Sequence, residues 1–594
     1  MKVIFTRFIK GYSLIYWIQR RLTQKQFLMF SAILIGLSAG IAAVAVKSFV
    51  HFFLHQINVL SAGRQVLAAL GPLIGIALTV IYVKYFNNNK LGKGLSNILN
   101  AIARKSSILP RDQTYSHIIT SSLTVGFGGS SGIESPMVTT GSAIGANYGK
   151  AYRLSYKERT LLLACGAAAG IAGAFNTPIA GVLFALEVLL VEANISAFIP
   201  ILMAAAAGTL VSQLILSDGV LLHFSLRQPF DATNVPFYIL LGLLCGLTSF
   251  YYAKVFLKVE EFFKRFERNS VLKVLVAGLV LFVMILFFPP LFGEGYANII
   301  QLSSLQAQEV FSNTIFPIKH FSPALLYLLL FLVLLIKPVA TAVTIGGGGN
   351  GGNFAPSLFM GAFVGFLFAS LLSELNIVQL PISNFTLVAM AGVLSGVFHA
   401  PLTGIFIIAE ITGGYELVIP LMIVSALSYA VSKYFMPLSI DFTKLSEKEK
   451  ILRTSTDEYL LSNLSLIDLV ETDFIEVQTG DTLRQLIEKM AVSKRNIFPV
   501  LDAEAKLQGL VTVDDVRDIM FKQEVYDKLT MQQLMHLPAC IITQKDDIRS
   551  AMKLFDESHL WNIPVVMDGK YLGFISKSSI LEKYREALIQ SSLD

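Results

Sequence analysis

Long apolar runs recur along the first three quarters of the chain, and each is long enough to cross a bilayer as a helix. They lie near residues 27–46, 65–83, 198–216, 235–257, 271–288, 324–345 and 416–434. Shorter apolar runs, interrupted by glycine and proline, lie between them near residues 157–174, 178–191, 357–372, 386–399 and 401–412. This pattern predicts an all-α domain that spans a membrane many times and contains broken helices.

Two glycine-rich stretches resemble each other across about 220 residues. The first is GFGGSSGIESPMVTTGSAIG at residues 126–145, and the second is IGGGGNGGNFAPSLFMGAFVG at residues 345–365. In both, a proline that suits a first helical turn precedes two glycines at the same offsets. Glu187 and Glu410 each end a second matched motif at a similar separation. The sequence therefore predicts two related halves, each with a helix that begins inside the membrane.

Two sets of residues in these repeats have a structural interpretation. Glu187 and Glu410 occupy symmetric positions, so we expect both to be scaffold carboxylates. Gly141, Gly145 and Gly149 lie on one face of a helix, a spacing that lets neighbouring helices approach closely.

The pattern changes near residue 445, where charged residues become frequent and the long apolar runs end. Residues 496–516 and 562–581 each predict strand, turn, strand and helix, and an amphipathic helix precedes each of them. This predicts a soluble α/β tail made of two similar modules. The domain boundaries that we predict are 1–26 for an N-terminal segment, 27–445 for the membrane domain (repeats at about 27–220 and 235–440), 446–469 for a linker, and 470–525 and 530–590 for the modules.

Composition supports a membrane protein. Of 594 residues, 54% are hydrophobic and 15% charged, and the mean hydropathy is +0.63. The net charge of +6 requires no nucleic-acid partner, because basic residues cluster at the ends of the spans. Those before the first span place the N terminus in the cytoplasm. The three cysteines have no spacing that indicates a disulfide framework or a metal site, and we expect no removable signal peptide.

Several motifs in order resemble one known family. They are GxExP at residues 132–136, PxxGxxFxxE at 178–187, GxFxP at 352–356 and the paired modules of the tail. Together they resemble the CLC family of chloride channels and chloride/proton exchangers with two C-terminal CBS domains. The resemblance implies a membrane domain of two inverted repeats, tandem CBS domains in the cytoplasm, and a homodimer with a separate pathway in each subunit.

The family's anion pathway is built from helix N-termini, whose free amides attract an anion without a full positive charge in lipid. The resemblance implies that amides around Ile133, Glu134 and Ser135, and around Asn353 and Phe354, face the anion. Glu134 matches the gating glutamate of the family. When ionised, its carboxylate would block the anion site, and when protonated it would swing away.

Three positions depart from the family pattern. Lys93 replaces an anion-facing serine, where it could attract the anion, hold it, or point away. Val188 stands where exchangers carry a second, inner glutamate, as is usual in the family's channels. The inner tyrosine has no clear match, and Ser439, Asp441 or Phe442 could occupy its place. We therefore expect passive chloride conduction, with chloride/proton exchange through a non-standard proton path as the alternative.

CBS modules often bind adenine nucleotides through a serine or threonine and an aspartate. Thr512 and Asp515 match this pattern in the first module. Ser576 matches it in the second, but Ser579 stands in place of the aspartate. The resemblance implies at most one nucleotide site and no required cofactor, and a tail that only stabilises a dimer is the alternative.

Single features of the sequence also fit two other function classes. An intramembrane serine protease would use GSSG at residues 129–132 with His399 as base. The internal repeat explains both segments without that chemistry. A sensor with a membrane anchor would not require broken helices within the bilayer.

Overall fold

The computed structural model describes residues 21–61, 64–87, 91–92, 94–104, 106–189, 195–216, 228–266, 268–312, 314, 322–449, 466–544, 546–558, 560–583 and 585. The chain divides between Lys450 and Ile451 into two compact units, which are described separately.

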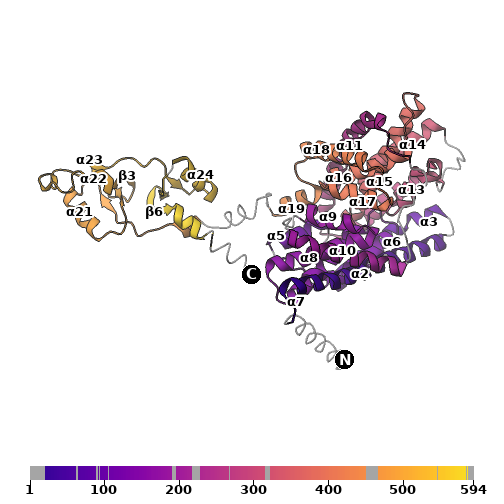
Figure 1. Cartoon of the computed structure of the whole chain (residues 1–594), viewed down its shortest axis with the longest axis horizontal. Coiled ribbons are helices and arrows are strands. Elements are labelled where there is room, and N and C mark those ends of the chain that lie inside the picture. Colours follow the sequence, from indigo (N-terminus) through magenta and orange to yellow (C-terminus); the bar gives the residue numbers. More distant parts are fainter. Residues whose placement is uncertain are drawn as a thin grey trace, which may run out of the picture. The chain divides into compact units, whose positions relative to one another are not determined.

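Helices build the first unit in two halves. The first half contains α2 (Gln24–Ser61), α3 (Gln65–Ala69), α4 (Gly71–Phe86), α5 (Leu95–Arg104), α6 (Gln113–Gly126), α7 (Glu134–Ala151), α8 (Tyr156–Phe175), α9 (Pro178–Val188) and α10 (Ile195–Leu216). The second contains α11 (Val235–Lys264), α12 (Ser270–Phe287), η2 (Pro289–Leu291), α13 (Tyr296–Ser303), α14 (Pro323–Gly346), α15 (Phe354–Glu374), α16 (Ile382–Phe398), α17 (Pro401–Ile411), α18 (Val418–Phe435) and α19 (Ile440–Glu449), with short 3-10 turns η1 (Ala232–Asn234) and η3 (Ala307–Phe311). Figure 1 shows the halves as adjoining layers, indigo to purple and pink to orange.

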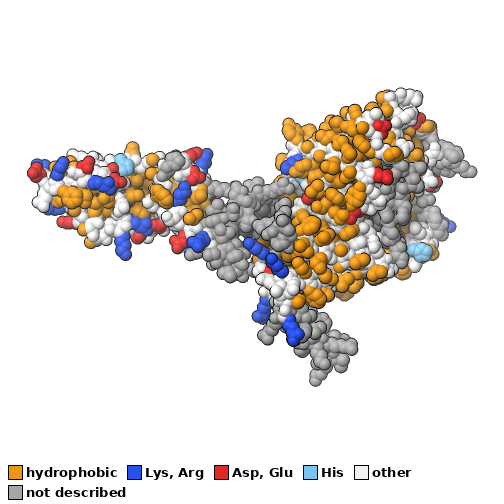
Figure 2. All heavy atoms as spheres, in the orientation of Figure 1, with side chains coloured by type: hydrophobic (Ala, Val, Ile, Leu, Met, Phe, Trp, Pro, Cys, Tyr) orange, Lys and Arg blue, Asp and Glu red, His pale blue; other side chains and the backbone are white. Residues whose placement is uncertain are grey.

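Among the described residues, nine helical stretches are long and apolar enough to cross a membrane. Hydrophobic side chains make up much of the face of this unit that is visible in Figure 2. Two of the nine, α8 and α15, cover runs that we expected to be short. That expectation was wrong because the glycines within these helices serve close packing and do not end them. α9 and α17 are short, as predicted.

Glycines bring α7 against α8, and α15 against α16, in equivalent pairs. A Cβ atom on Gly145 would lie 1.9 Å from the carbonyl oxygen of Leu162, and one on Gly365 would lie 2.3 Å from that of Phe385. Backbones this close exclude any side chain at these positions. The contacts confirm that the glycine face of residues 141–149 serves helix packing.

Reciprocal hydrogen bonds join the two halves. The amide of Gly132 donates to the carbonyl of Gly352 at 3.0 Å, and the amide of Gly352 donates to the carbonyl of Gly132 at 2.8 Å. The two glycine-rich loops therefore run antiparallel to each other. This reciprocity is the relation that two inverted repeats require.

Glu187 and Glu410 form a second reciprocal set. Glu187, near the end of α9, accepts hydrogen bonds from the amides of Leu402 and Thr403 at the start of α17 (3.0 and 2.7 Å). Glu410, near the end of α17, accepts from two amides at the start of α9 (3.1 and 2.9 Å). Each carboxylate thus caps the helix of the other half, where the amides and the macrodipole favour a negative charge. The predicted scaffold role of both glutamates is confirmed.

The second unit contains two three-stranded sheets. In order, its elements are η4 (Ile467–Leu469), β1 (Val477–Gln478), α21 (Leu483–Val492), β2 (Ile497–Leu501), β3 (Leu507–Thr512), α22 (Val513–Val516), η5 (Gln523–Val525), α23 (Met531–Leu534), β4 (Ile542–Thr543), α24 (Ile548–Ser558), β5 (Asn562–Met567) and β6 (Lys570–Ser576). In each sheet, the first strand pairs parallel to the second and the second pairs antiparallel to the third. Residues 577–583 are helical after β6, as α22 follows β3, so the predicted strand, turn, strand and helix pattern is confirmed in both modules.

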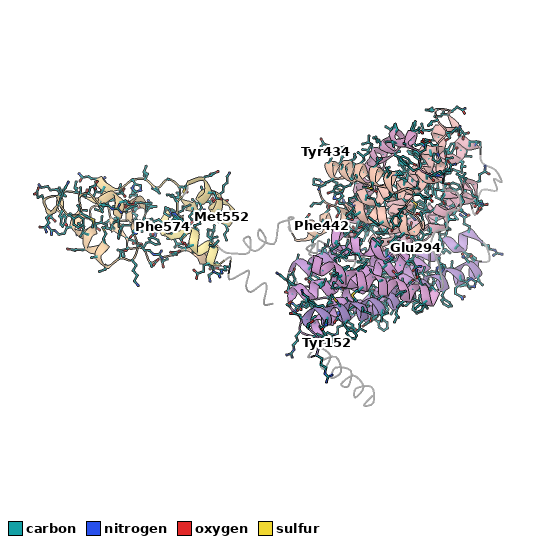
Figure 3. The ribbon with its side chains drawn as sticks, viewed as in Figure 1. Tyr152, Glu294, Tyr434, Phe442, Met552 and Phe574 are labelled. Carbon is teal, nitrogen blue, oxygen red and sulfur yellow. The ribbon has the colours of Figure 1, made fainter. Side chains whose placement is uncertain are left out.

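Hydrophobic contacts connect the two modules. The rings of Phe474 and Phe574 lie 4.3 Å apart and form a small cluster with Leu510 (Figure 3 labels Phe574). Leu466 and Leu469, within the predicted linker, are buried in the core of the second module. The last residues of that segment therefore belong to the folded unit.

Candidate functional site

Two helix N-termini meet where the glycine-rich loops pair. α7 begins at Glu134 and α15 at Phe354, each directly after a loop that the Gly132–Gly352 bridge joins. The preceding residues, Ile133 and Asn353, provide no side-chain cap to their helices. The positive ends of two helices are thus directed at one region, which is a favourable place for an anion.

Glu134 extends its carboxylate into this region. The side chain is 1% exposed. A Cβ atom on Gly132 would lie 2.0 Å from Oε2 of Glu134 and 3.1 Å from the amide nitrogen of Ala355, so Oε2 lies beside the first turn of α15. Oε1 accepts a hydrogen bond from the hydroxyl of Tyr296 at 2.5 Å. The carboxylate therefore occupies the space between the two helix starts.

A second carboxylate, Glu294, lies next to Glu134. Its Oε1 accepts a hydrogen bond from the amide of Ile133 at 3.2 Å. Figure 3 labels Glu294 near the boundary between the purple and pink halves. The Nζ of Lys337, a fully buried residue of α14, donates to Ser130 Oγ at 3.0 Å and to the carbonyl of Gly293 at 3.3 Å. The amide of Ile133, which we expected to face the anion, is thus engaged by Glu294.

The sequence reasoning missed Glu294, Tyr296 and Lys337. The signal was present: FGEGY at residues 292–296 places a carboxylate between two glycines after an apolar run, and Lys337 interrupts another apolar run. An ionisable residue inside a membrane segment indicates a functional or pairing role.

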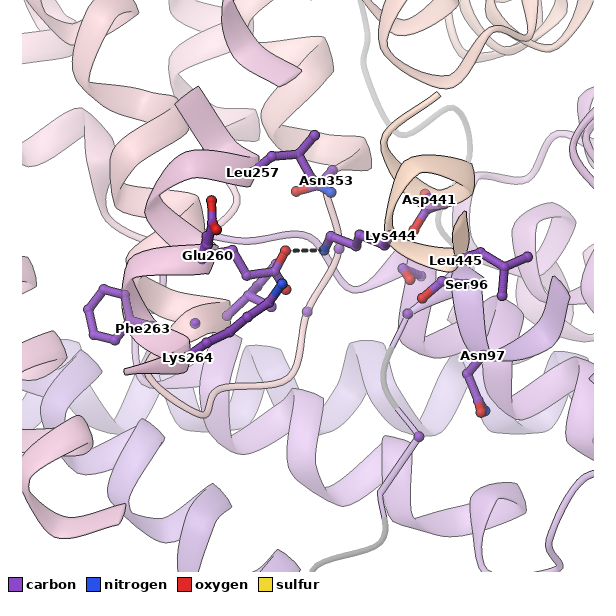
Figure 4. A pocket seen from close by; sticks show the side chains of 18 of the residues that line it. Ser96, Asn97, Leu257, Glu260, Phe263, Lys264, Asn353, Asp441, Lys444 and Leu445 are labelled. Carbon is purple, nitrogen blue, oxygen red and sulfur yellow. Dashed lines mark ion pairs between the residues drawn. The ribbon is translucent and has the colours of Figure 1, made fainter. Parts of the chain in front are cut away.

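A cavity of about 350 Å³ adjoins the helix starts (Figure 4). Ser135 and Asn353 line it, together with residues of α5, α11 and α19. Glu260 of α11 and Lys444 of α19 form an ion pair across it at 2.6 Å, drawn dashed in Figure 4. Residues of both halves therefore surround one chamber, lined by polar and apolar side chains, that reaches two of the predicted anion-facing positions.

Phe354 and Asn353 are held by neighbouring side chains. The Phe354 ring is buried and lies 5.3 Å from the ring of Phe175 and 5.5 Å from that of Phe398. The Oδ1 of Asn353 accepts a hydrogen bond from the hydroxyl of Tyr252 at 3.1 Å. Both residues therefore have fixed orientations beside the helix start.

Of the three positions that depart from the family pattern, Lys93 lies outside the described residues. Val188 is a buried apolar residue at the end of α9. Of the three candidates for the inner tyrosine position, Asp441 is the one that lines the cavity, while Ser439 and Phe442 are not among its lining residues.

The pair required by the protease hypothesis does not form. Ser131 is fully buried, and its hydroxyl has no hydrogen-bond partner among the described residues. It lies against Gly351, on which a Cβ atom would come within 2.2 Å of Ser131 Oγ. The ring of His399 packs edge-on against Tyr429. A serine without a bonded base lacks the activation that nucleophilic catalysis needs.

In the second unit, Thr512 and Asp515 form a capping box at the start of α22. The amide and the hydroxyl of Thr512 donate to Asp515 Oδ2 at 2.6 and 2.7 Å, and the amide of Asp515 donates back to the hydroxyl at 3.3 Å. In the second module, the hydroxyl of Ser576 donates to Glu471 Oε1 at 2.5 Å and accepts from the amide of Ser579 at 2.9 Å. Asp515 is exposed, whereas Ser576 is buried.

Comparison with known families decides the class of the protein. The family model described as "Voltage gated chloride channel" matches residues 74–433, which is more than half of the chain. The chain belongs to this CLC family. The CBS domain model matches residues 466–522 and 531–586 in the second unit. The protein is therefore a CLC-family anion transport protein of the membrane, with two CBS domains.

Similar proteins include channels and exchangers by name. The chain is 26% identical to chloride channel protein CLC-f of Arabidopsis thaliana, over 67% of this chain and 56% of that protein. It is also 26% identical to the H(+)/Cl(-) exchange transporter ClcA of Klebsiella pneumoniae, over 68% of this chain and 86% of that protein.

Solved structures share the fold of this CLC protein. A slow cyanobacterial Cl-/H+ antiporter superposes with a TM-score of 0.62 at 23% identity, and the match covers 72% of this chain and 98% of that one. A eukaryotic CLC transporter superposes with a TM-score of 0.60 at 21% identity, and the match covers 95% of this chain and 98% of that one.

Proposed function

We propose that this CLC-family protein conducts chloride passively through a pathway that Glu134 gates. The observation that carries the proposal is the buried carboxylate of Glu134, which lies beside Gly132 and Ala355 between the starts of α7 and α15. A carboxylate that occupies an anion site prevents an anion from binding there.

The gate works by competition for the same helix ends. The ionised carboxylate is attracted by the amides and dipoles of both helices, as chloride is. Protonation removes most of this attraction, so the side chain leaves and an anion replaces it. The cavity lined by Ser135 and Asn353 then supplies the anion from the other side. Because helix ends carry partial charges, they bind chloride weakly enough for it to leave.

Passive conduction is supported by Val188, since a valine cannot relay a proton where exchangers carry a glutamate. One observation favours exchange as a second candidate. Asp441 is a buried acid that lines the cavity, where it could pass a proton toward Glu134.

The test is a coupled flux measurement on purified protein in liposomes. A chloride gradient is imposed, and chloride efflux and external pH are recorded together. Chloride flux without coupled proton movement supports the channel. Proton movement against its own gradient supports exchange, and Asp441→Asn should then abolish proton movement. Glu134→Gln should make chloride flux less sensitive to pH, and an unchanged pH response would contradict the gate.

The role of Lys93 is a further part of this proposal. Its neighbours in the chain, Gly92 and Gly94, line the cavity, and the lysine replaces a serine that faces the anion elsewhere in the family. Lys93→Ser should weaken or broaden anion selectivity. Identical permeability ratios in both proteins would show that the lysine does not face the anion.

We also propose that the protein is a homodimer with one pathway in each subunit and with both chain ends in the cytoplasm.

We further propose that an adenine nucleotide binds at the first CBS domain. The exposure of Asp515, and the partial exposure of Thr512 beside it, support the nucleotide site. An adenine nucleotide should raise the unfolding temperature of the protein, and Asp515→Ala should remove that rise while Ser579→Ala keeps it. Equal unfolding temperatures with and without nucleotide would contradict the nucleotide site. Thr512 and Asp515 would then only cap α22.

A further inference from the structure

We infer that Glu294 is a second gating carboxylate, which occupies the Ile133 amide at the start of α7 and must release it before an anion can pass Glu134. The inference rests on the proposed anion pathway and adds a group to it. The two carboxylates stand in series at one helix end.

The first argument is the hydrogen bond itself. An anion at the N-terminus of α7 would use the amides that no helical carbonyl satisfies. The amide of Ile133 is one of them, and Glu294 Oε1 accepts its hydrogen at 3.2 Å. Glu134 occupies the neighbouring space beside Gly132 and Ala355. Each carboxylate therefore holds a different part of the surface that an anion needs.

The second argument is the position of Glu294 along the pathway. Ser135 lines the cavity described above, whereas neither Glu134 nor Glu294 is among the described residues that line it. Ile133, on the other side of Glu134 in the chain, is the residue that Glu294 contacts. Glu294 therefore contacts the start of α7 outside the part that lines the cavity.

The third argument is that the loop of Glu294 is fixed. The amide of Gly293 donates to the carbonyl of Gly128 at 3.0 Å, and Lys337 donates to the carbonyl of Gly293. Lys337 also holds Ser130, so one buried lysine connects the Glu294 loop to the first glycine-rich loop. The backbone is thereby held in place, and release of the amide requires the side chain of Glu294 to move.

The charges around Glu294 make its hold on the amide depend on pH. The charged and titratable groups that interact electrostatically with it are Glu134 of α7, Tyr296 of α13, Lys337 of α14 and Lys47 of α2. The lysines favour a negative charge at this place, while Glu134 opposes it. Two carboxylates this close resist simultaneous ionisation, so protonation of one changes the state of the other. Glu294 should therefore contribute its own part of the pH response.

Chloride efflux from liposomes at acidic and neutral external pH tests the inference in five proteins: wild type, Glu294→Gln, Glu294→Ala, Glu134→Gln, and Glu134→Gln combined with Glu294→Ala. We expect Glu294→Ala to raise flux at neutral pH by roughly 10- to 150-fold, the range for one hydrogen bond to a charged group. Glu134→Gln should retain a residual pH dependence, which the double variant loses. Glu294→Gln removes the charge at nearly constant shape, and it should shift the pH profile even if the alanine variant folds poorly.

Glu374→Gln is the control. Glu374 accepts a hydrogen bond from the hydroxyl of Tyr327 at 2.7 Å, as Glu134 does from that of Tyr296, but it lies at the exposed end of α15. Its flux and pH profile should equal those of wild type. Wild-type profiles in both Glu294 variants, or no residual pH dependence in Glu134→Gln, would overturn the inference while leaving the Glu134 gate intact. A wild-type protein that carries no chloride would overturn the proposed function and this inference together.

Discussion

Removing the hydroxyl of Tyr296 should weaken the closed state of the gate. The hydroxyl donates to Glu134 Oε1 at 2.5 Å, and a hydrogen bond to a charged group contributes about 1.5–3 kcal/mol. Tyr296→Phe removes this bond but keeps the ring, which packs edge-on against Phe175 at 6.3 Å. At 1.4 kcal/mol per factor of ten, the open-to-closed ratio should rise by roughly 10- to 150-fold.

The assay is chloride efflux from liposomes at two values of pH. At neutral pH the anion must displace the ionised carboxylate of Glu134. Tyr296→Phe should therefore increase the flux there. At acidic pH the effect should be smaller, because protonated Glu134 already leaves the site. In a Glu134→Gln background the substitution should change nothing. Tyr251→Phe is the matched control, since that hydroxyl donates to the backbone carbonyl of Leu335. Wild-type flux in Tyr296→Phe at both values of pH would refute the reasoning.

Three further substitutions test the scaffold and the tail. Glu410→Gln should lower the stability by about 1–2 kcal/mol, because a neutral group caps the start of α9 less well, and thermal unfolding in detergent measures this. Gly145→Ala should cost about 1–3 kcal/mol and lower the yield of folded protein, because its methyl group would meet the carbonyl of Leu162 at 1.9 Å. The Arg495 guanidinium hydrogen-bonds Asp473 and holds the pKa of that carboxyl below its usual value, so Arg495→Met should destabilise the second unit at neutral pH but not at acidic pH.

The sign of the last prediction follows from the direction of the shift. A carboxyl whose pKa is lowered by folding stabilises the protein above its unfolded pKa and loses that contribution as the pH falls through the folded pKa. The difference between the two proteins should therefore vanish in acid, and a difference that grows in acid would contradict it. Gly480→Ala is a control for the glycine substitution, since nothing lies within 4 Å of a Cβ atom there. Equal unfolding temperatures for Glu410→Gln and wild type would show that the charge of Glu410 does not stabilise the start of α9.

Much of the fold could be predicted because the repeat consists of residue types, such as glycine and proline, that occur in few structural contexts. Glycine, proline and glutamate at equal offsets predict two related halves with matching helix starts and symmetric scaffold carboxylates, and the contacts of Glu187 and Glu410 agree. The lengths of α8 and α15 could not be predicted in this way. A glycine inside a helix and a glycine that ends one look alike in sequence, and only the neighbour decides. Gly166 of α8, for example, is required because a Cβ atom there would lie 1.9 Å from the carbonyl of Gly141.

The site was predictable where it rests on local pattern, as at the starts of α7 and α15. It was not predictable where partners come from distant segments. The hydrogen bond between Ile133 and Glu294 spans 161 residues, and that between Glu134 and Tyr296 spans 162. No periodicity relates such positions. Leu466 and Leu469 show the same limit in the tail, because two leucines in a polar segment do not reveal which core they enter.

The exchange of caps between α9 and α17 has a consequence for how the protein is made. Glu410 is synthesised 230 residues after Ala180, whose amide it accepts. At about 5–20 residues per second, the start of α9 would wait roughly 10–50 s for its acceptor. During that time its amides lack the carboxylate that caps them in the folded protein. The first half of the protein therefore cannot complete its folding until Glu410 has been synthesised. A chain truncated before Glu410 would keep the start of α9 uncapped.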